Sequence, residues 1–294
     1  MAVLATAVET GSLSAAGRRL GMPLATVSRT ISELEAHLKI RLLNRTTRSL
    51  GLTESGAAYV AASRRILEQV DEAERAAGGE YSQPRGELVV TAPIVFGRLH
   101  LLPVVTHFLQ AFPQIDVRLM LTDRVMHLLD DRIDIAFRIG ALPDSGLVAT
   151  RLGSVRRVVC ASPAYWKQHG APKTPAELAA HDCISFEAME APQRWDFPGG
   201  AVTVHVRLGV NTAEAALDAA VAGLGVTRLL SYQAERALEA GQLKIALKSF
   251  ETPPIPVHML HGGQGLLPLK LRSFLDFAAP RLKMRLVRLN EVTH

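Results

Sequence analysis

The residues best suited to do chemistry near the N-terminus are small polar side chains and an arginine on a short amphipathic helix. Four apolar side chains recur at spacings of 4, 3 and 4 residues and form one stripe along the helix, which we expect to be buried: Val27, Ile31, Leu34 and Leu38. The residues off this stripe are small and polar or cationic: Thr26, Ser28, Arg29, Thr30 and Ser32. Small side chains let a helix approach the major groove of DNA, where an arginine can reach a guanine or grip a phosphate.

The neighbouring segments predict the elements that would position this helix. Residues 14–20 form a short helix, Gly21 can take the left-handed conformation that ends it, and Pro23 suits the first turn of the next helix. Two short helices joined by a glycine turn indicate a helix-turn-helix, although many amphipathic helix pairs look alike. Residues 40–52 then alternate around a polar turn and carry three arginines, Arg41, Arg45 and Arg48. A basic β-turn there predicts a wing that contacts the DNA backbone or the minor groove.

The charge distribution favours the same interpretation. The chain has 33 Lys and Arg against 28 Asp and Glu, a net charge of +5. Residues 1–52 hold seven Lys or Arg against three Glu, a surplus of four, whereas residues 53–80 hold three Arg against six acids. A small basic head on a nearly neutral body is typical of a nucleic-acid-binding module attached to another domain, although solvated surface charge gives the same counts.

A long helix is expected after the wing. Thr53 is suited to cap a helix that runs to about Ala77. Its small and apolar positions follow a 4-3-4-3-4 spacing: Tyr59, Ser63, Ile66, Val70, Ala73 and Ala77. This heptad spacing predicts a dimer contact, and the alternative is an ordinary amphipathic helix packed on its own chain. Residues 78–86 are rich in Gly, Pro and polar residues and predict a linker.

Beyond the linker, short β-branched runs alternate with segments of helical periodicity. The expected strands are 87–92, 115–121, 133–139, 155–161, 182–186, 202–206, 226–230, 243–247 and 255–260. The expected helices are 97–112, 123–131, 211–223 and 267–279. This alternation predicts an α/β domain with a mostly parallel sheet, and it leaves open whether the strands form one sheet or two lobes.

Other chemistry finds little support in the sequence. Cys160 and Cys183 are too few for a disulfide scaffold and have no zinc-ligand spacing, so we expect buried, reduced thiols and no metal or cofactor. His258 and His261 lie on an expected strand and are not predicted to share a metal. The chain has no nucleophile elbow and no phosphate-binding loop, so no catalytic residue is predicted. We expect no secretory signal, no membrane span and a cytoplasmic location.

Several segments resemble the LysR-type transcriptional regulators. The N-terminal half carries ETGSLSAAGRRLGM, three further residues and TVSRTISELEAHL at residues 9–38, followed by RLLNRTTRSLGLTESG at residues 41–56. The second half carries GELVVTAPIVFGR at 86–98, FLQAFPQIDVRLMLTDR at 108–124, DIAFRIG at 134–140, CASPAYW at 160–166 and AAVAGLGV at 219–226. The chain is similar to the branch with an RTTR wing and an effector domain that opens with a TAP or SAP tripeptide.

The resemblance implies an organisation for the whole chain. The fold class is α/β, with an N-terminal all-α winged helix-turn-helix (1–52) and a dimerising linker helix (53–79). A hinge (80–86) leads to an effector-binding domain (87–294) with two lobes like a periplasmic binding protein. The first lobe is expected to take 87–158 and 262–294, and the second 159–261. The implied partners are double-stranded operator DNA, a small-molecule effector and further copies of the chain, as a homodimer or homotetramer, with no membrane.

The resemblance also implies site residues. The DNA contacts fall on Ala25, Thr26, Ser28, Arg29, Arg45, Thr47 and Arg48, and the dimer contacts on Tyr59, Ile66, Val70 and Ala73. Two departures stand out. The first helix begins near Ala2 and looks a turn short, which questions Met1 as the start, and Pro23 and Leu24 replace a serine-containing pair that could cap the recognition helix or bind a phosphate.

The effector is expected outside the carboxyl ends of the strands, near helix N-termini. The expected lining is Thr91, Pro93, Phe96, Arg138, Asn211 and Thr212. Arg138 would suit an effector carboxylate, or it forms a salt bridge to Asp134 or another acid, and Phe96 fits a core as well as a cleft.

Three functions therefore compete. The first is a transcription regulator controlled by a small molecule. The second is a solute-binding or enzymatic α/β protein with an accessory helical head, and the ordered recognition-helix and wing pattern disfavours it. The third is a constitutive DNA-binding protein whose C-terminal domain serves only assembly.

Overall fold

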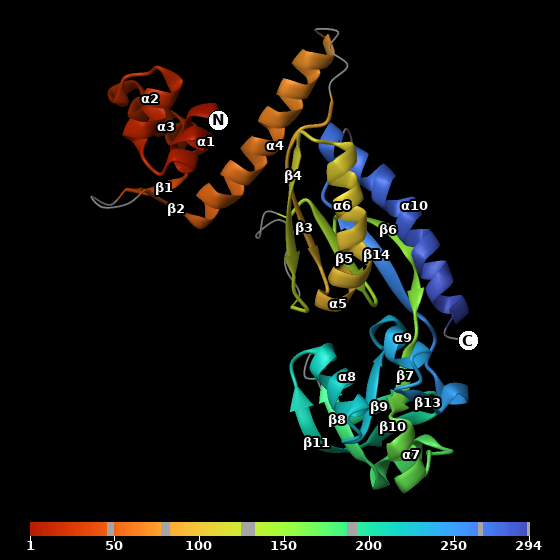
Figure 1. Ribbon diagram of the computed structural model, residues 1–294. Coiled ribbons are helices and arrows are strands. Elements are labelled where there is room, and N and C mark those ends of the chain that lie inside the picture. The colour runs from red at the N-terminus through yellow and green to blue at the C-terminus, as the bar shows by residue number, and fades with distance from the viewer. Residues whose placement is uncertain (46–49, 78–82, 125–132, 187–192, 264–266, 293–294) are drawn as a thin grey trace. The chain divides into compact units, whose positions relative to one another are not determined.

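The structure is a computed structural model, and it describes all residues except 46–49, 78–82, 125–132, 187–192, 264–266 and 293–294 (Figure 1). The chain divides into two compact units. Met1–Pro84 make up most of the first unit, and nearly all residues from Arg85 onward make up the second.

The first unit contains the expected three helices, a two-stranded hairpin and a long helix. These elements are α1 (Ala2–Thr10), α2 (Leu13–Leu20), α3 (Leu24–Leu38), β1 (Leu43–Arg45), β2 (Leu50–Leu52) and α4 (Glu54–Ala77). Ser12 caps α2 by accepting a hydrogen bond from the Ala15 amide at 3.0 Å, and Gly21 ends it with φ +65°. The buried core is drawn from every helix and the first strand: Leu4, Ala7, Ala16, Val27, Ile31, Leu42, Leu43 and Val60.

The second unit has two five-stranded sheets. Its strands therefore form two lobes and not one large sheet. The sheet of the first lobe has the order β4-β3-β5-β14-β6, and that of the second lobe β11-β8-β12-β7-β13. The first sheet consists of β3 (Gly86–Ala92), β4 (Ile115–Leu121), β5 (Ile135–Ile139), β6 (Val148–Val155) and β14 (Ile255–His261). The second consists of β7 (Arg157–Ala161), β8 (Asp182–Phe186), β11 (His205–Val210), β12 (Val226–Leu230) and β13 (Lys244–Ala246).

The lobe boundaries differ from the expected ones. Residues 155–161 were expected as one strand, but the chain leaves the first sheet after Val155 and enters the second at Arg157. It returns before Ile255, so β14 belongs to the first lobe and not to the second. An ion pair joins the two crossings, because Arg156 Nη1 lies 2.8 Å from Glu251 Oε2. The Arg156 carbonyl also accepts a hydrogen bond from the Ser231 amide at 2.8 Å.

Two helical segments packed against each other belong to the first lobe. The first runs from α5 (Ile94–Phe96) through a π-helical turn, η1 (Gly97–Leu101), into α6 (Leu102–Ala111). The second is α10 (Leu269–Val292), which contacts α6 through Phe108 and Phe274, whose ring centroids are 4.9 Å apart (Figure 1). By length and composition alone, residues 94–111 would also suffice to cross a membrane, a test that a buried core helix passes as well. Four of their apolar side chains are buried in the lobe: Phe96, Leu101, Val105 and Phe108.

The closing helix was expected to end at Ala279, and this was wrong, because α10 continues through Pro280 to Val292. A proline inside a helix removes one hydrogen bond and costs about 3 kcal/mol. The apolar face continues on both sides of the proline and stays buried: Leu271, Phe274, Ala278, Leu282, Leu286 and Leu289. Burying three more leucines offsets the lost bond, at about 2 kcal/mol for each.

Helices and a hairpin complete the second lobe. They are α7 (Pro163–His169), η2 (Pro175–Ala180), the hairpin β9 (Arg194–Phe197) and β10 (Gly200–Thr203), α8 (Ala213–Val221), α9 (Ser231–Glu239) and η3 (Lys248–Phe250). Residues 202–206 were expected as one strand but divide between β10 and β11. The expected helix at 123–131 lies almost entirely outside the described residues.

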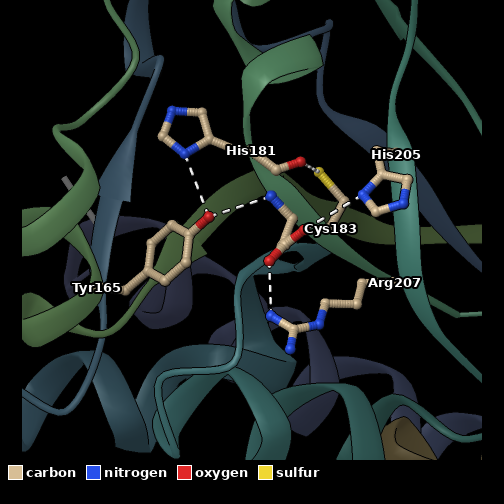
Figure 2. A network of polar contacts seen from close by, with 6 residues as sticks. Tyr165, His181, Cys183, His205 and Arg207 are labelled. Carbon is tan, nitrogen blue, oxygen red and sulfur yellow. Dashed lines mark hydrogen bonds and ion pairs between the residues drawn. The ribbon is translucent and has the colours of Figure 1, made fainter.

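A polar network fixes the amino ends of two strands in the second lobe (Figure 2). The Tyr165 hydroxyl lies 3.3 Å from His181 Nδ1 and accepts a hydrogen bond from the Asp182 amide at 3.2 Å. The Asp182 carboxylate, at the start of β8, lies 2.7 Å from Arg207 Nη1 and 3.2 Å from His205 Nδ1, both on β11. Because these contacts gather at the amino edge of the parallel strands, we interpret the network as structural.

Candidate DNA interface and effector site

The recognition helix α3 separates its apolar and polar residues as the sequence predicts. Val27 and Ile31 are fully buried, whereas Ala25 and Arg29 are exposed and Thr26 and Ser28 are half-buried. Arg29 Nε lies 3.6 Å from Glu33 Oε1, with 73% and 68% of the two side chains exposed. Such a surface pair contributes less than about 1 kcal/mol, so Arg29 can exchange Glu33 for a base or phosphate at little cost.

The N-terminus of α3 has backbone donors in place of a side-chain cap. Pro23 precedes the helix, and its carbonyl accepts from the amides of Thr26 and Val27 at 2.9 and 3.1 Å. The amides of Leu24 and Ala25 come before this first intrahelical bond. Free amides at a helix N-terminus suit a phosphate, so a contact here does not depend on the serine that the sequence lacks.

The wing is anchored to the recognition helix. Glu35 Oε1, on α3, accepts hydrogen bonds from the amides of Leu42 and Leu43 at 2.7 and 3.0 Å. Strands β1 and β2 pair in antiparallel register, with Leu43 opposite Leu52. Thr47 and Arg48 lie outside the described residues, and of Arg45 only the backbone is described. Strand β1 is therefore held directly to α3 by way of Glu35.

Helix α4 is bound to its own domain at its start and exposes apolar residues further on. Thr53 caps it by accepting from the Gly56 amide at 2.9 Å. The side chain of Tyr59 packs against the core of the first unit, and Ser63 is buried. Ile66 and Val70 are 44% and 46% exposed. Of the predicted dimer residues, Tyr59 is partly buried against its own domain and Ile66 and Val70 are exposed, while the side chain of Ala73 lies outside the description.

Two of the expected effector residues lie in the core of the first lobe. Thr91 and Phe96 are fully buried. The Phe96 ring lies 6.1 Å from that of Phe137 and 5.8 Å from that of Tyr232, which belongs to α9 of the second lobe. Of the two positions that the sequence leaves open for Phe96, core or cleft, the structure shows a buried apolar contact between the lobes.

The helix N-termini expected to receive an anion already have protein partners. Asp123 Oδ1 accepts a hydrogen bond from the Ile94 amide at 3.1 Å, at the start of α5. Burial is the main cause that raises the pKa of Asp123, with a further contribution from Glu214. At α8, Thr212 is the cap and accepts from the Ala215 amide at 3.3 Å, whereas Asn211 is exposed. A carboxylate effector would meet the Asp123 carboxylate at the first of these sites.

Sequence reasoning missed the polar contacts that join the lobes here. Arg98 Nη2 of the first lobe lies 3.4 Å from Glu214 Oε1 of the second. Arg285 donates to His100 Nδ1 at 3.3 Å and lies 3.2 Å from Glu235 Oε2 on α9. The sequence shows only that these residues carry opposite charges. It does not show which of them pair, because the partners are far apart along the chain.

Of the remaining expected residues, Pro93 and Arg138 are half-buried. Arg138 Nη1 donates to the Phe137 carbonyl at 3.3 Å, and burial lowers the pKa of Arg138. The Asp134 carboxylate, the salt-bridge partner considered from the sequence, accepts from the Val89 amide at 2.8 Å. Both Pro93 and Arg138 therefore stay candidates.

Within the described part of the chain, no group of three or more His, Cys, Asp or Glu side chains is placed to hold a metal ion. Burial raises the pKa of both thiols, Cys160 and Cys183, to about 12, so they are protonated at neutral pH. The two thiols are therefore poor nucleophiles at neutral pH.

Comparison with known proteins identifies the family. Residues 1–57 match the bacterial regulatory helix-turn-helix proteins of the lysR family, and residues 82–283 match the LysR substrate binding domain. The chain therefore belongs to the LysR family of DNA-binding transcriptional regulators, with a helix-turn-helix followed by a two-lobed effector-binding domain.

Its relatives include proteins of opposite regulatory sign. It is 34% identical over 283 residues to an "HTH-type transcriptional repressor" of Pseudomonas aeruginosa, covering 94% of this chain and 89% of that one. It is 32% identical over 281 residues to the "HTH-type transcriptional activator AaeR" of Escherichia coli, covering 94% and 91%. The solved structure of CrgA, a LysR-type transcriptional regulator from Neisseria meningitidis, matches with a TM-score of 0.62 and 32% identity, covering 95% of this chain and 97% of that one.

Proposed function

We propose that the protein binds an operator as a homodimer and that a small molecule held by the two-lobed unit controls its action there. The observation that carries DNA recognition is the separation of faces on α3, where Val27 and Ile31 are buried while Arg29 is exposed. The proposed contacts on α3 also include the exposed Ala25 and the half-buried Thr26 and Ser28, and those of the wing are Arg45, Thr47 and Arg48. A role on the chromosome places the protein in the cytoplasm.

The relatives include an activator and a repressor, so control of an operator complex by a ligand is compatible with either regulatory sign. The effector is expected where the two lobes meet, since both lobes present strand ends and charged groups there. A constitutive DNA-binding protein would contain the same α3 surface, so response to a ligand is the property that separates the two functions.

The dimer contact is proposed on the exposed part of α4. Ile66 and Val70 are large apolar residues at 44% and 46% exposure, one helical turn apart on the same face. Replacing both by Asp should yield monomers in light scattering and weaken operator binding, because each monomer then contacts only one half-site. The matched control is Ala58→Asp, on an exposed position of the same helix. A double variant that stays dimeric would contradict the assignment.

Operator binding is tested by a gel shift with DNA from upstream of the protein's own gene, against a shuffled fragment of equal length. The proposal expects preferential binding of the upstream fragment with a steep decrease as salt rises, because Lys and Arg displace counterions from phosphates. Equal, weak binding to both fragments would contradict it. Titration with candidate metabolites then tests whether the complex responds to a ligand.

A further inference from the structure

A buried arginine in the second lobe has no acceptor among the described residues for most of its donors. Arg228, the central residue of β12, is 6% exposed. Its Nη1 donates to the Asp196 carbonyl at 3.0 Å. Its Nε and Nη2 atoms are buried and have no hydrogen-bond partner among the described residues. Burial lowers the pKa of Arg228 to about 10, so the guanidinium is still charged at neutral pH.

Aromatic rings surround this guanidinium. Its central carbon lies 5.1 Å from the ring centroid of Trp195 and 5.8 Å from that of Phe197, both on β9. Cation–π contacts stabilise the charge, but they provide no acceptor for N–H groups. The indole Nε1 of Trp195 is itself buried without a partner in the described structure. The aromatic hairpin thus covers a charged group and leaves its hydrogen-bonding edge unsatisfied.

A second arginine shares the same face of the sheet. Arg157 pairs with Leu230 in the antiparallel register of β7 and β12, and Val159 pairs with Arg228. Because alternate residues of a strand share a face, Arg157 and Arg228 lie diagonally across one side of the sheet. Arg157 is partly exposed, and burial lowers its pKa as well. The charge of Arg157 also contributes to the lowered pKa of Arg228, after burial as the main cause.

Asp196 is the acid that influences the charge of both arginines, but it does not form a close ion pair with either of them in the described structure. Asp196 raises the pKa of both, but its side chain is 70% exposed and lies 3.3 Å from Arg194. A buried charge without a close counter-ion costs several kcal/mol. Arg156, the residue next to Arg157, shows the compensated case, with Glu251 at 2.8 Å. Arg157 and Arg228 thus offer two positive charges to an anion, and the described side chains do not provide that anion.

The position of the pair in the fold suits a ligand. Arg157 stands opposite Leu230, the last residue of β12, and β12 runs parallel to β8. Arg157 therefore lies at the carboxyl edge of the parallel strands, the edge at which open α/β sheets bind their ligands. The chain also crosses between the lobes at this edge, at Arg156.

We infer that Arg157 and Arg228 form an anion site in the second lobe that binds the carboxylate of a small ligand, with the Nε and Nη2 edge of Arg228 as the bidentate fork. The inference rests on the proposed function, because it places the acid group of the effector in the second lobe. At the start of α5 in the first lobe, Asp123 opposes an anion.

Trp195 supplies a direct reporter of binding. The chain has two tryptophans, and Trp166→Phe leaves Trp195 as the only indole. The full-length W166F protein is titrated with benzoate and with benzamide, its uncharged counterpart, at constant ionic strength. The inference expects a saturable change in Trp195 fluorescence with benzoate and none with benzamide. No change with benzoate, or equal changes with both, would overturn it.

Variants of the pair locate the binding. In the W166F protein, Arg157→Gln and Arg228→Lys should each weaken benzoate binding at least tenfold, because the first removes a charge and the second keeps the charge but removes the fork. Arg194→Gln, an exposed arginine on the same hairpin, should bind benzoate as before. Thermal unfolding checks that each variant folds. If the Arg228 variant does not fold, the variant of the partly exposed Arg157 still tests the inference. Unchanged binding in R157Q, or loss on Arg138→Gln, would place the anion elsewhere and overturn the inference.

Operator binding by the unliganded wild-type protein is measured in parallel by gel shift. Failure to bind any operator would contradict the proposed function, while the fluorescence titration would still test the anion site by itself. If the protein binds its operator but benzoate changes the Trp195 fluorescence no more than benzamide does, only the anion site is contradicted.

Discussion

Arginines serve the two units of this protein in opposite surroundings. Arg29 of the first unit has 73% of its side chain exposed and a loose partner in Glu33, so water solvates its charge before DNA does. In the second unit, Arg156 is buried and compensated by Glu251, whereas Arg228 is buried without a carboxylate partner among the described residues. The comparison teaches that an exposed cation can change partners at little cost in free energy. A buried cation that lacks a counter-ion costs several kcal/mol of stability.

The largest expected effect comes from breaking the compensated buried pair. Glu251→Gln leaves the Arg156 guanidinium without its counter-charge at the point where the chain crosses between the lobes. We expect the free energy of unfolding to fall by about 3–5 kcal/mol in urea denaturation. The control is Glu87→Gln, which breaks the exposed pair of Glu87 and Arg118 and should cost less than about 1 kcal/mol. Equal losses in the two variants would refute the role of burial.

A second effect follows from His100, which is buried where the lobes meet. Burial, with contributions from Arg285 and Arg236, lowers its pKa from 6.5 to about 4. Between these values the unfolded chain binds a proton that the folded chain does not, so stability falls as pH decreases through this window. The loss over the whole window is about 3 kcal/mol. Urea unfolding at several pH values should show a flatter profile for His100→Gln than for His107→Gln, an exposed control on α6. Identical profiles would exclude His100 as the cause.

The smallest expected effect concerns the exposed arginine. If Arg29 reads a base, Arg29→Ala should reduce discrimination between operator and shuffled DNA by about 1–3 kcal/mol. If Arg29 grips a phosphate, both DNAs should lose affinity equally and the salt slope should decrease by about one. The free energy of unfolding should hardly change, in contrast to Glu251→Gln. An unchanged affinity for both DNAs would remove Arg29 from the interface.

Local patterns predicted much of the fold. The strands at 115–121, 182–186 and 226–230 appear with the expected bounds, because each is a short and largely apolar run that is followed by a polar residue in the sequence. The break at Arg156 was missed, because no glycine or proline marks a strand that passes from one sheet to another. The end of α10 was misplaced for the opposite reason, since burial of Leu282, Leu286 and Leu289 outweighs Pro280.

The two candidate sites were predictable to different degrees. The α3 surface depends on residues within one helix, so spacing alone separates Val27 from Arg29. The second unit depends on register between distant strands. Arg228 interrupts an apolar run in the sequence, which is a usable signal, but only the pairing of β7 with β12 brings it near Arg157. For Phe96, no feature of the neighbouring sequence distinguishes a ring in the core from a ring that lines a cleft.

The most direct test of the account is a DNase I footprint of the full-length protein on the DNA upstream of its own gene, for the wild type and for Arg29→Ala. The account predicts protection of a two-fold-symmetric site by the wild type, with half-sites about one or more helical turns apart, and weaker or less selective protection by the variant. Protection without symmetry or sequence preference by the wild type would contradict operator recognition by a dimer.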